Sequence, residues 1–104
     1  MFRRGRFDNL IRRQLDLFEA DEASLLDEAD EADRAWTNAG ATESEELYGD
    51  YQLVVDTIGE RLYETRETYA SSLDERTADD YREAFNRAAA KRFRGYAAFL
   101  VDEA

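Results

Sequence analysis

Histidine, cysteine and proline are all absent from the 104 residues of this chain. Without histidine or cysteine, the sequence cannot supply a serine–histidine or cysteine–histidine catalytic pair, a thiolate nucleophile, a zinc finger or the usual haem ligands. The common di-iron and di-manganese centres of helical bundles also require histidine. Glycine-rich phosphate loops and acidic calcium loops are missing as well. We therefore expect a protein that is not an enzyme and that holds no cofactor.

Long apolar runs are also missing. The longest unbroken run, residues 96–101, has six residues, which is too short for a membrane span or for the apolar core of a signal peptide. We expect a cytoplasmic protein with no membrane partner. A chain of this length normally forms one domain around one modest core, so we expect a single helical domain over residues 1–104.

Turn-forming residues are scarce, since only five glycines accompany the missing prolines. Apolar residues recur three or four positions apart, which is the spacing of one face of an amphipathic helix. This pattern predicts three helices, over residues 8–39, 43–71 and 78–103. The residues suited to cap their N-termini are Asp8, Thr42 and Thr77. We expect an all-α protein, an antiparallel up-down-up three-helix bundle.

The apolar stripes of these helices are wider than a three-helix bundle requires. Surplus apolar surface indicates a contact with another protein, and the simplest partner is a second copy of the chain. We therefore expect a homodimer that acts as an interaction or scaffolding module. The candidate contact residues are Leu10, Leu17, Leu26, Trp36, Tyr48, Val55 and Tyr63.

Charge is distributed unevenly along the chain, whose net charge is −11. Residues 1–13 carry a net charge of +4, whereas residues 14–50 carry −12. Within the basic end, residues 1–7 form an arm in which arginine alternates with phenylalanine, a pattern that can bind nucleic-acid phosphates. The acidic body would repel a polyanion, so we expect no nucleic-acid partner. The arm is instead expected to bind acidic residues of its own chain or of a partner subunit.

The densest acidic run has two interpretations. Its members are Asp27, Glu28, Asp30, Glu31 and Asp33. If the first and third helices run parallel, these carboxylates lie level with Lys91, Arg92 and Arg94 and form an interhelical charge ladder. Alternatively, they form an exposed acidic face that binds a cation or a basic protein, as a mimic of nucleic acid would. Adaptation to salt would produce the same acidity without any function.

Glu22 interrupts the apolar stripe of the first predicted helix. A buried carboxylate requires an arginine, a tyrosine or a metal ion as partner. Glu22 is therefore the candidate centre of a carboxylate-lined metal or cationic-ligand site inside the bundle, which is the alternative to the interaction module. The competing interpretation places Glu22 at the edge of the stripe, with its carboxylate in water.

Overall fold

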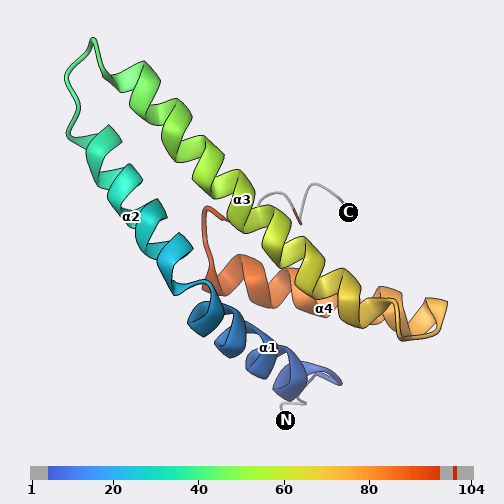
Figure 1. Ribbon diagram of the computed structural model, residues 1–104. Helices are drawn as coiled ribbons and strands as arrows, with labels where there is room; N and C mark the ends of the chain where they lie inside the picture. Colours follow the sequence, from blue (N-terminus) through green and yellow to red (C-terminus); the bar gives the residue numbers. More distant parts are fainter. Residues whose placement is uncertain (1–4, 97–99, 101–104) are drawn as a thin grey trace.

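The chain is helical throughout most of the part that the computed structural model describes, residues 5–96 and residue 100. Its helices there are α1 (Asp8–Asp21), α2 (Ala23–Thr37), α3 (Ser44–Ala70) and α4 (Glu75–Arg92), with no strand (Figure 1). The all-α prediction is confirmed. None of these helices is long and apolar enough to cross a membrane.

The helix predicted over residues 8–39 is in fact two helices, so the described chain has four helices and not three. The break is at Glu22, whose φ of −107° and ψ of 24° are not helical. The Glu22 N–H still donates to the Phe18 carbonyl at 2.8 Å, and the Leu26 N–H donates to the Glu22 carbonyl at 3.0 Å. The chain therefore changes direction at one residue while these two helical hydrogen bonds are kept.

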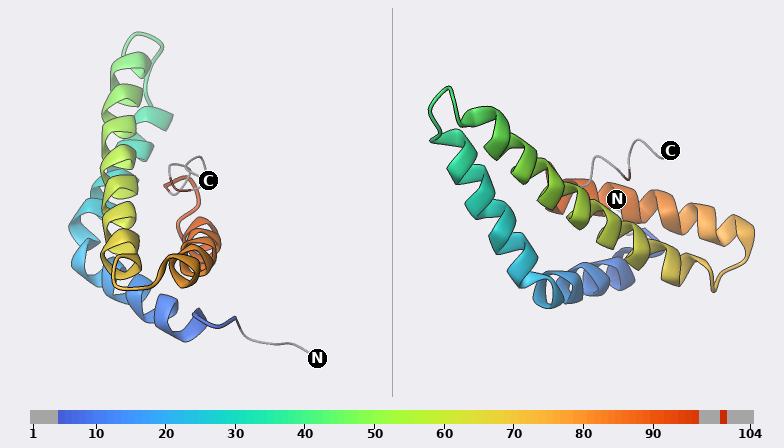
Figure 2. Two further views of the ribbon diagram at one scale, coloured as in Figure 1. Left: turned by 90° about the vertical axis from the view of Figure 1, so that its right-hand side faces the viewer. Right: turned by 45° about the horizontal axis from the view of Figure 1, so that its top comes forward.

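The bend at Glu22 directs α1 and α2 to different partners. Helices α2 and α3 form a long antiparallel hairpin, while α1 and α4 pack together beside the C-terminal half of α3 (Figures 1 and 2). The chain extends over 50 × 26 × 26 Å. The core consequently lies at the end where three helices meet, and the hairpin projects beyond it.

Helix α4 supplies the centre of that core. Tyr81 and Phe85 are fully buried on it, with 0% exposure each. The Tyr81 ring lies edge-on to Phe7 at 5.5 Å and 4.8 Å from the ring of Tyr69. Its hydroxyl donates a hydrogen bond to Gln14 Oε1 at 2.8 Å. One tyrosine thus joins α4 to α3 and to α1.

The burial of Tyr81 predicts a loss of stability at alkaline pH. Burial raises the pKa of Tyr81 from 10.0 to about 12. Because the folded state favours the neutral phenol, this contribution is complete below pH 10 and is lost as pH rises towards 12. We expect the free energy of unfolding to fall by about 2 kcal/mol across this range. Urea unfolding at several alkaline pH values measures this fall in the free energy of unfolding. In Tyr81→Phe, the free energy of unfolding should depend less on pH over the same range. Native-state ultraviolet titration in which every tyrosine ionises near its ordinary pKa would contradict it.

The other two predicted helices differ from the structure mainly at their ends. The one predicted over 43–71 is α3, and the one predicted over 78–103 begins three residues earlier, at Glu75. Asp74 is the cap in place of Thr77, because its carboxylate accepts the Thr77 N–H at 3.0 Å and the Thr77 hydroxyl at 2.7 Å. Helix α4 ends at Arg92, before a turn in which Gly95 has a φ of +87°. The remainder of that prediction, apart from the buried Leu100, lies outside the described residues.

Candidate protein-interaction surface

The outer part of the α2–α3 hairpin, residues 27–56, is termed the distal hairpin. Three aromatic rings hold its two helices together near the connecting loop. The ring of Trp36 lies 5.0 Å from that of Tyr48 and stacks on Tyr51 at 6.0 Å, with 11° between the planes. Tyr48 is nevertheless 45% exposed. The distal hairpin is thus stabilised by its own aromatic contacts, away from the core formed with α1 and α4.

One face of the distal hairpin is an open groove with a volume of about 520 Å³. Its apolar lining comes from Ala32, Ala35, Leu47, Leu53 and Val54. Leu53 is 67% exposed, the highest value among the large apolar residues that the structure describes. The groove is therefore an apolar surface that the described chain leaves in contact with solvent.

Carboxylates border this groove. Glu28 and Glu31 line it from α2, and Asp50 lines it from α3. All three residues are exposed, and none of them forms an ion pair with any other residue that the structure describes. The groove thus combines apolar contact area with an unneutralised negative border.

A different face of α2 is covered by the turn that follows α4. Phe93 and Tyr96 line a hollow there together with Asp27, Asp30 and Arg92. Burial raises the pKa of Tyr96, and the negative charge of Asp30 raises it further. The end of the described chain therefore lies against one side of the hairpin and leaves the groove on the other side open.

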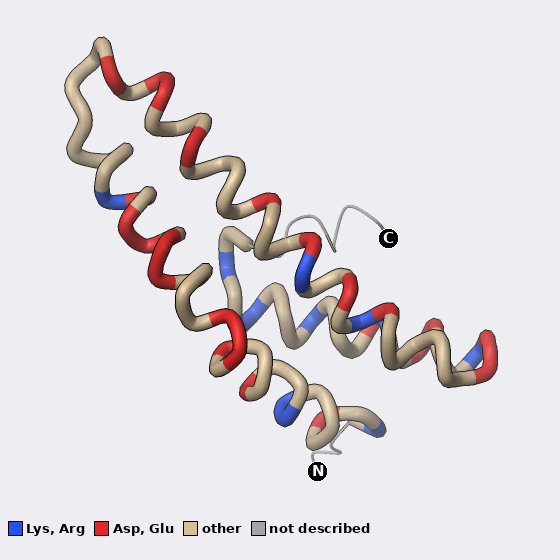
Figure 3. The backbone as a smooth tube through the Cα atoms, viewed as in Figure 1, with Lys and Arg blue, Asp and Glu red and all other residues tan. Residues whose placement is uncertain are grey.

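The predicted charge ladder between the acidic run and the basic end of α4 is wrong for Arg92. Arg92 pairs with Asp16 and with Glu19, at 2.8 Å from the latter, so its partners lie on α1. All five residues of the acidic face, Asp27, Glu28, Asp30, Glu31 and Asp33, are exposed. None of them forms an ion pair within the described chain. The bend at Glu22 explains this difference, because α1 rather than α2 packs along α4 (Figure 3).

Glu22 has an arginine as its partner. Arg61 Nη1, on α3, lies 2.8 Å from Glu22 Oε1, and 20% of the Glu22 side chain is exposed. Across residues 5–96 and residue 100, no group of three or more acidic side chains is placed to hold a metal ion. The ion pair with Arg61 ties the α1–α2 bend to the middle of α3.

The predicted contact residues separate into three groups. Leu17 and Tyr48 are exposed, at 61% and 45%, while Val55 and Trp36 are half-buried. The remaining three pack against the core: Leu10, Leu26 and Tyr63. Sequence reasoning missed Leu53, although the run of three apolar residues 53–55 is wider than one helix face and could have indicated it.

Sequence reasoning also missed a polar cluster between α3 and α4. Arg66 is buried there, and it donates to Glu67 Oε2 and to Asn86 Oδ1, both at 2.8 Å. Arg82 donates two hydrogen bonds to Glu67, at 2.9 and 3.0 Å. These bonds, chiefly those from Arg82, hold the pKa of Glu67 below its ordinary value. The cluster joins two helices through partners that are already satisfied, so it resembles a structural ion-pair network more than an open binding site.

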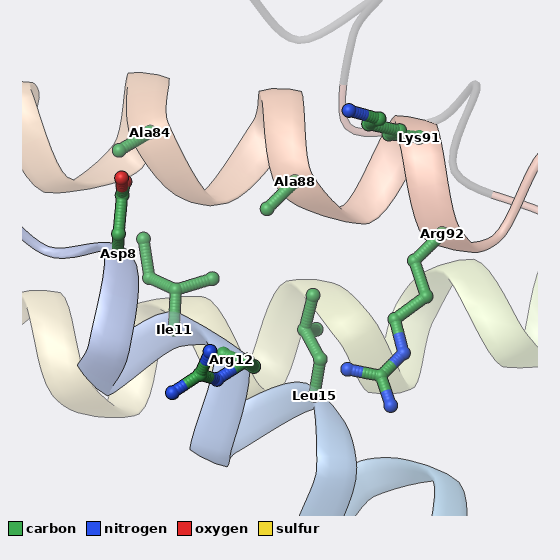
Figure 4. Close-up of a pocket in the computed structure, with 8 residues that line it drawn as sticks. All are labelled: Asp8, Ile11, Arg12, Leu15, Ala84, Ala88, Lys91 and Arg92. Atoms are coloured by element: carbon green, nitrogen blue, oxygen red, sulfur yellow. The ribbon is translucent and has the colours of Figure 1, made fainter. Parts of the chain in front are cut away.

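A second groove lies between α1 and α4. Its floor consists of Ile11 and Leu15 facing Ala84 and Ala88, and its volume is about 380 Å³ (Figure 4). The alanines allow the two helices to pack closely, and both facing apolar residues of α1 are buried. This groove is therefore part of the helix packing that builds the core.

The distal groove is the surface best suited to a partner. It offers apolar and carboxylate groups, which can bind apolar side chains flanked by cations. The residues that line it carry no thiol, imidazole or hydroxyl group. No protein-family model, no curated protein and no solved structure matches this chain.

Proposed function

We propose that this protein is a non-enzymatic protein-interaction module that forms a homodimer through its distal hairpin. The observation that carries the proposal is the exposure of Leu53, at 67%, on the open apolar groove. A single exposed leucine is ordinary on a protein surface. In this chain it adjoins further apolar residues in a concave surface, which is typical of an interaction site.

The two-helix thickness of the distal hairpin supports a partner of the same kind. When two amphipathic helices pack only against each other, the apolar side chains that flank the contact between them stay partly exposed. A third helix or chain segment packed on the pair would cover these side chains. Leu47 and Val54 are half-buried in this way. A second copy of the chain can supply the segment that covers these side chains, and it is always present at the same concentration. A closed two-fold dimer is also the commonest assembly of identical chains.

Leu53→Ser is expected to dissociate the dimer. Loss of a leucine that becomes buried on association removes about 1.5–3 kcal/mol of contact energy, which corresponds to a rise of roughly tenfold to hundredfold in the dimer dissociation constant. Because Leu53 is mostly exposed in the single chain, the helical fold should be retained. Sedimentation equilibrium measures the constant, and circular dichroism checks the fold.

The matched control is Leu17→Ser. Leu17 is 61% exposed and lies on α1, outside the distal hairpin. This variant should keep the dissociation constant within about twofold of the unchanged protein. If Leu17→Ser dissociates the dimer and Leu53→Ser does not, the contact surface lies on α1 and the proposed one is wrong.

A further inference from the structure

The charge of the distal hairpin restricts which part of a second copy can cover its groove. Residues 27–56 contain ten carboxylates and a single base, Arg34. Two distal hairpins packed face to face would bring a net charge of −9 against another −9, and like charges at a contact oppose association. The groove therefore requires a partner segment that carries positive charge as well as apolar side chains.

The N-terminal arm of the chain has this composition. Residues 1–6 contain Phe2 together with Arg3, Arg4 and Arg6, and no acid. The next residue, Phe7, already makes a contact within its own chain, because its ring packs edge-on against Tyr81 at 5.5 Å. The guanidinium of Arg6 lies over the same ring, 5.3 Å from its centroid, and Gly5 donates a hydrogen bond to Asp8. Residues 1–4 are therefore the part of the basic arm that we assign to another contact.

A capped turn fixes the point where this arm joins the fold. The Gly5 N–H donates to Asp8 Oδ2 at 2.7 Å, and the Asp8 N–H donates to the Gly5 carbonyl at 3.2 Å. Any side chain at position 5 would meet Asp8, since an added Cβ would lie 2.5 Å from Asp8 Oδ1. The arm thus starts from a defined place at the beginning of α1.

That place is too far from the groove for the arm to reach it within one chain. The start of α1 lies beside the C-terminal half of α3, well away from the α2–α3 loop (Figures 1 and 2). Helix α1 alone accounts for about 21 Å of the separation, and part of α2 adds to it. The four residues before Gly5 span at most about 14 Å. The groove and the arm can therefore meet only between two copies.

We propose that residues 1–4 of one copy occupy the distal groove of the other, with Phe2 on the apolar floor and Arg3 and Arg4 beside Glu28, Glu31 and Asp50. This inference rests on the proposed homodimer and specifies its contact. An antiparallel pairing brings the arm of each copy to the groove of its partner, so the two contacts are equivalent and the assembly closes at two chains.

Charge reversal tests the pairing directly. The arm variant is Arg3→Glu/Arg4→Glu, and the groove variant is Glu28→Lys/Glu31→Lys/Asp50→Lys. Each alone should raise the dimer dissociation constant at least about tenfold, and one chain that carries both sets should recover most of the loss. The groove variant should fold, because these carboxylates have no ion pairs in the described chain. Sedimentation equilibrium is the measurement.

A second triple variant controls for net charge. Glu60→Lys/Glu64→Lys/Glu83→Lys changes the charge by the same amount at three residues outside the groove. It should leave the dissociation constant unchanged or lower it slightly, because it reduces the overall repulsion between copies. A loss equal to that of the groove variant would overturn the inference.

The dependence on salt separates this contact from a face-to-face one. Raising the ionic strength from about 0.05 to about 0.5 M should weaken an arm–groove contact, whereas it should strengthen a contact between two acidic faces. If the arm variant dimerises normally while Leu53→Ser does not, the inference fails and the proposed function stands. If the unchanged protein is monomeric at micromolar concentration, the proposed homodimer fails, and this inference fails with it.

Discussion

Phe85→Ala is expected to lower the free energy of unfolding by about 4 kcal/mol. Phe85 is fully buried, and its ring lies 5.9 Å from that of Tyr81 at the centre of the core. Removing it takes away buried apolar contacts and leaves a cavity in the core. Since domains of this size are stabilised by only about 5–15 kcal/mol, the loss is a large fraction of the total.

Thermal and urea unfolding measure this effect. A loss of this size corresponds to a fall in melting temperature of roughly 15–30 °C for a chain of about 100 residues. Leu17→Ala is the control, because it truncates an apolar side chain that is 61% exposed, and it should change stability by less than about 0.5 kcal/mol. Equal effects of the two substitutions would show that α4 does not supply the core.

Glu67→Ala is expected to destabilise the fold by about 3 kcal/mol, because it leaves the buried guanidinium of Arg66 without its carboxylate. The side chain of Arg66 is only 5% exposed. Its remaining contacts are the amide of Asn86 and the ring of Tyr63, whose centroid lies 4.9 Å from the guanidinium carbon. The same substitution removes both hydrogen bonds from Arg82, so α3 and α4 lose their main polar connection.

The matched control is Glu83→Ala. Glu83 lines the same α3–α4 hollow and forms no ion pair within the described chain, so its removal should change stability by less than about 0.5 kcal/mol. Adding Arg66→Met to Glu67→Ala should recover more than half of the loss, because the buried charge is then gone. Urea unfolding of the four proteins measures these differences. A loss below about 1 kcal/mol for Glu67→Ala would show that water solvates Arg66 adequately.

The acid response of the unchanged protein follows from the same cluster. Because the pKa of Glu67 is held below its ordinary value of 4.5, its contribution to stability is present above that pH and is lost as pH falls through the lowered value. This loss should be absent from Glu67→Ala. The free energy of unfolding of that variant should therefore fall less steeply as the pH is lowered below 4.5.

The helices themselves were predictable because their signals are local. Spacing at three and four residues marks a helix wherever it occurs, and all three predicted segments are helical over most of the residues that the structure describes. The start of α4 was three residues in error, since Asp74 and Thr77 are both good caps. The observed hydrogen bonds from Thr77 to Asp74 show that the two residues act together, with Thr77 as donor.

The exposed face was predicted only in part. Of the predicted contact residues, Leu17 and Tyr48 are exposed, whereas Leu10, Leu26 and Tyr63 pack against the core. The edge of an apolar stripe faces solvent or a neighbouring helix according to the angle at which that neighbour crosses. A sequence does not specify that angle, so it could not distinguish Leu53 from Leu26.

The sequence by itself determined that this protein is helical and acidic and that histidine and cysteine chemistry is excluded, because composition and periodicity depend on no distant contact. Only the tertiary structure decided the bend at Glu22, the partners of Arg92 and the burial of Arg66. Each of these depends on residues that are far apart in the chain, such as Glu22 and Arg61. The bend in turn leaves the distal hairpin uncovered by α1 and α4, and that exposed groove is the basis of the proposed function.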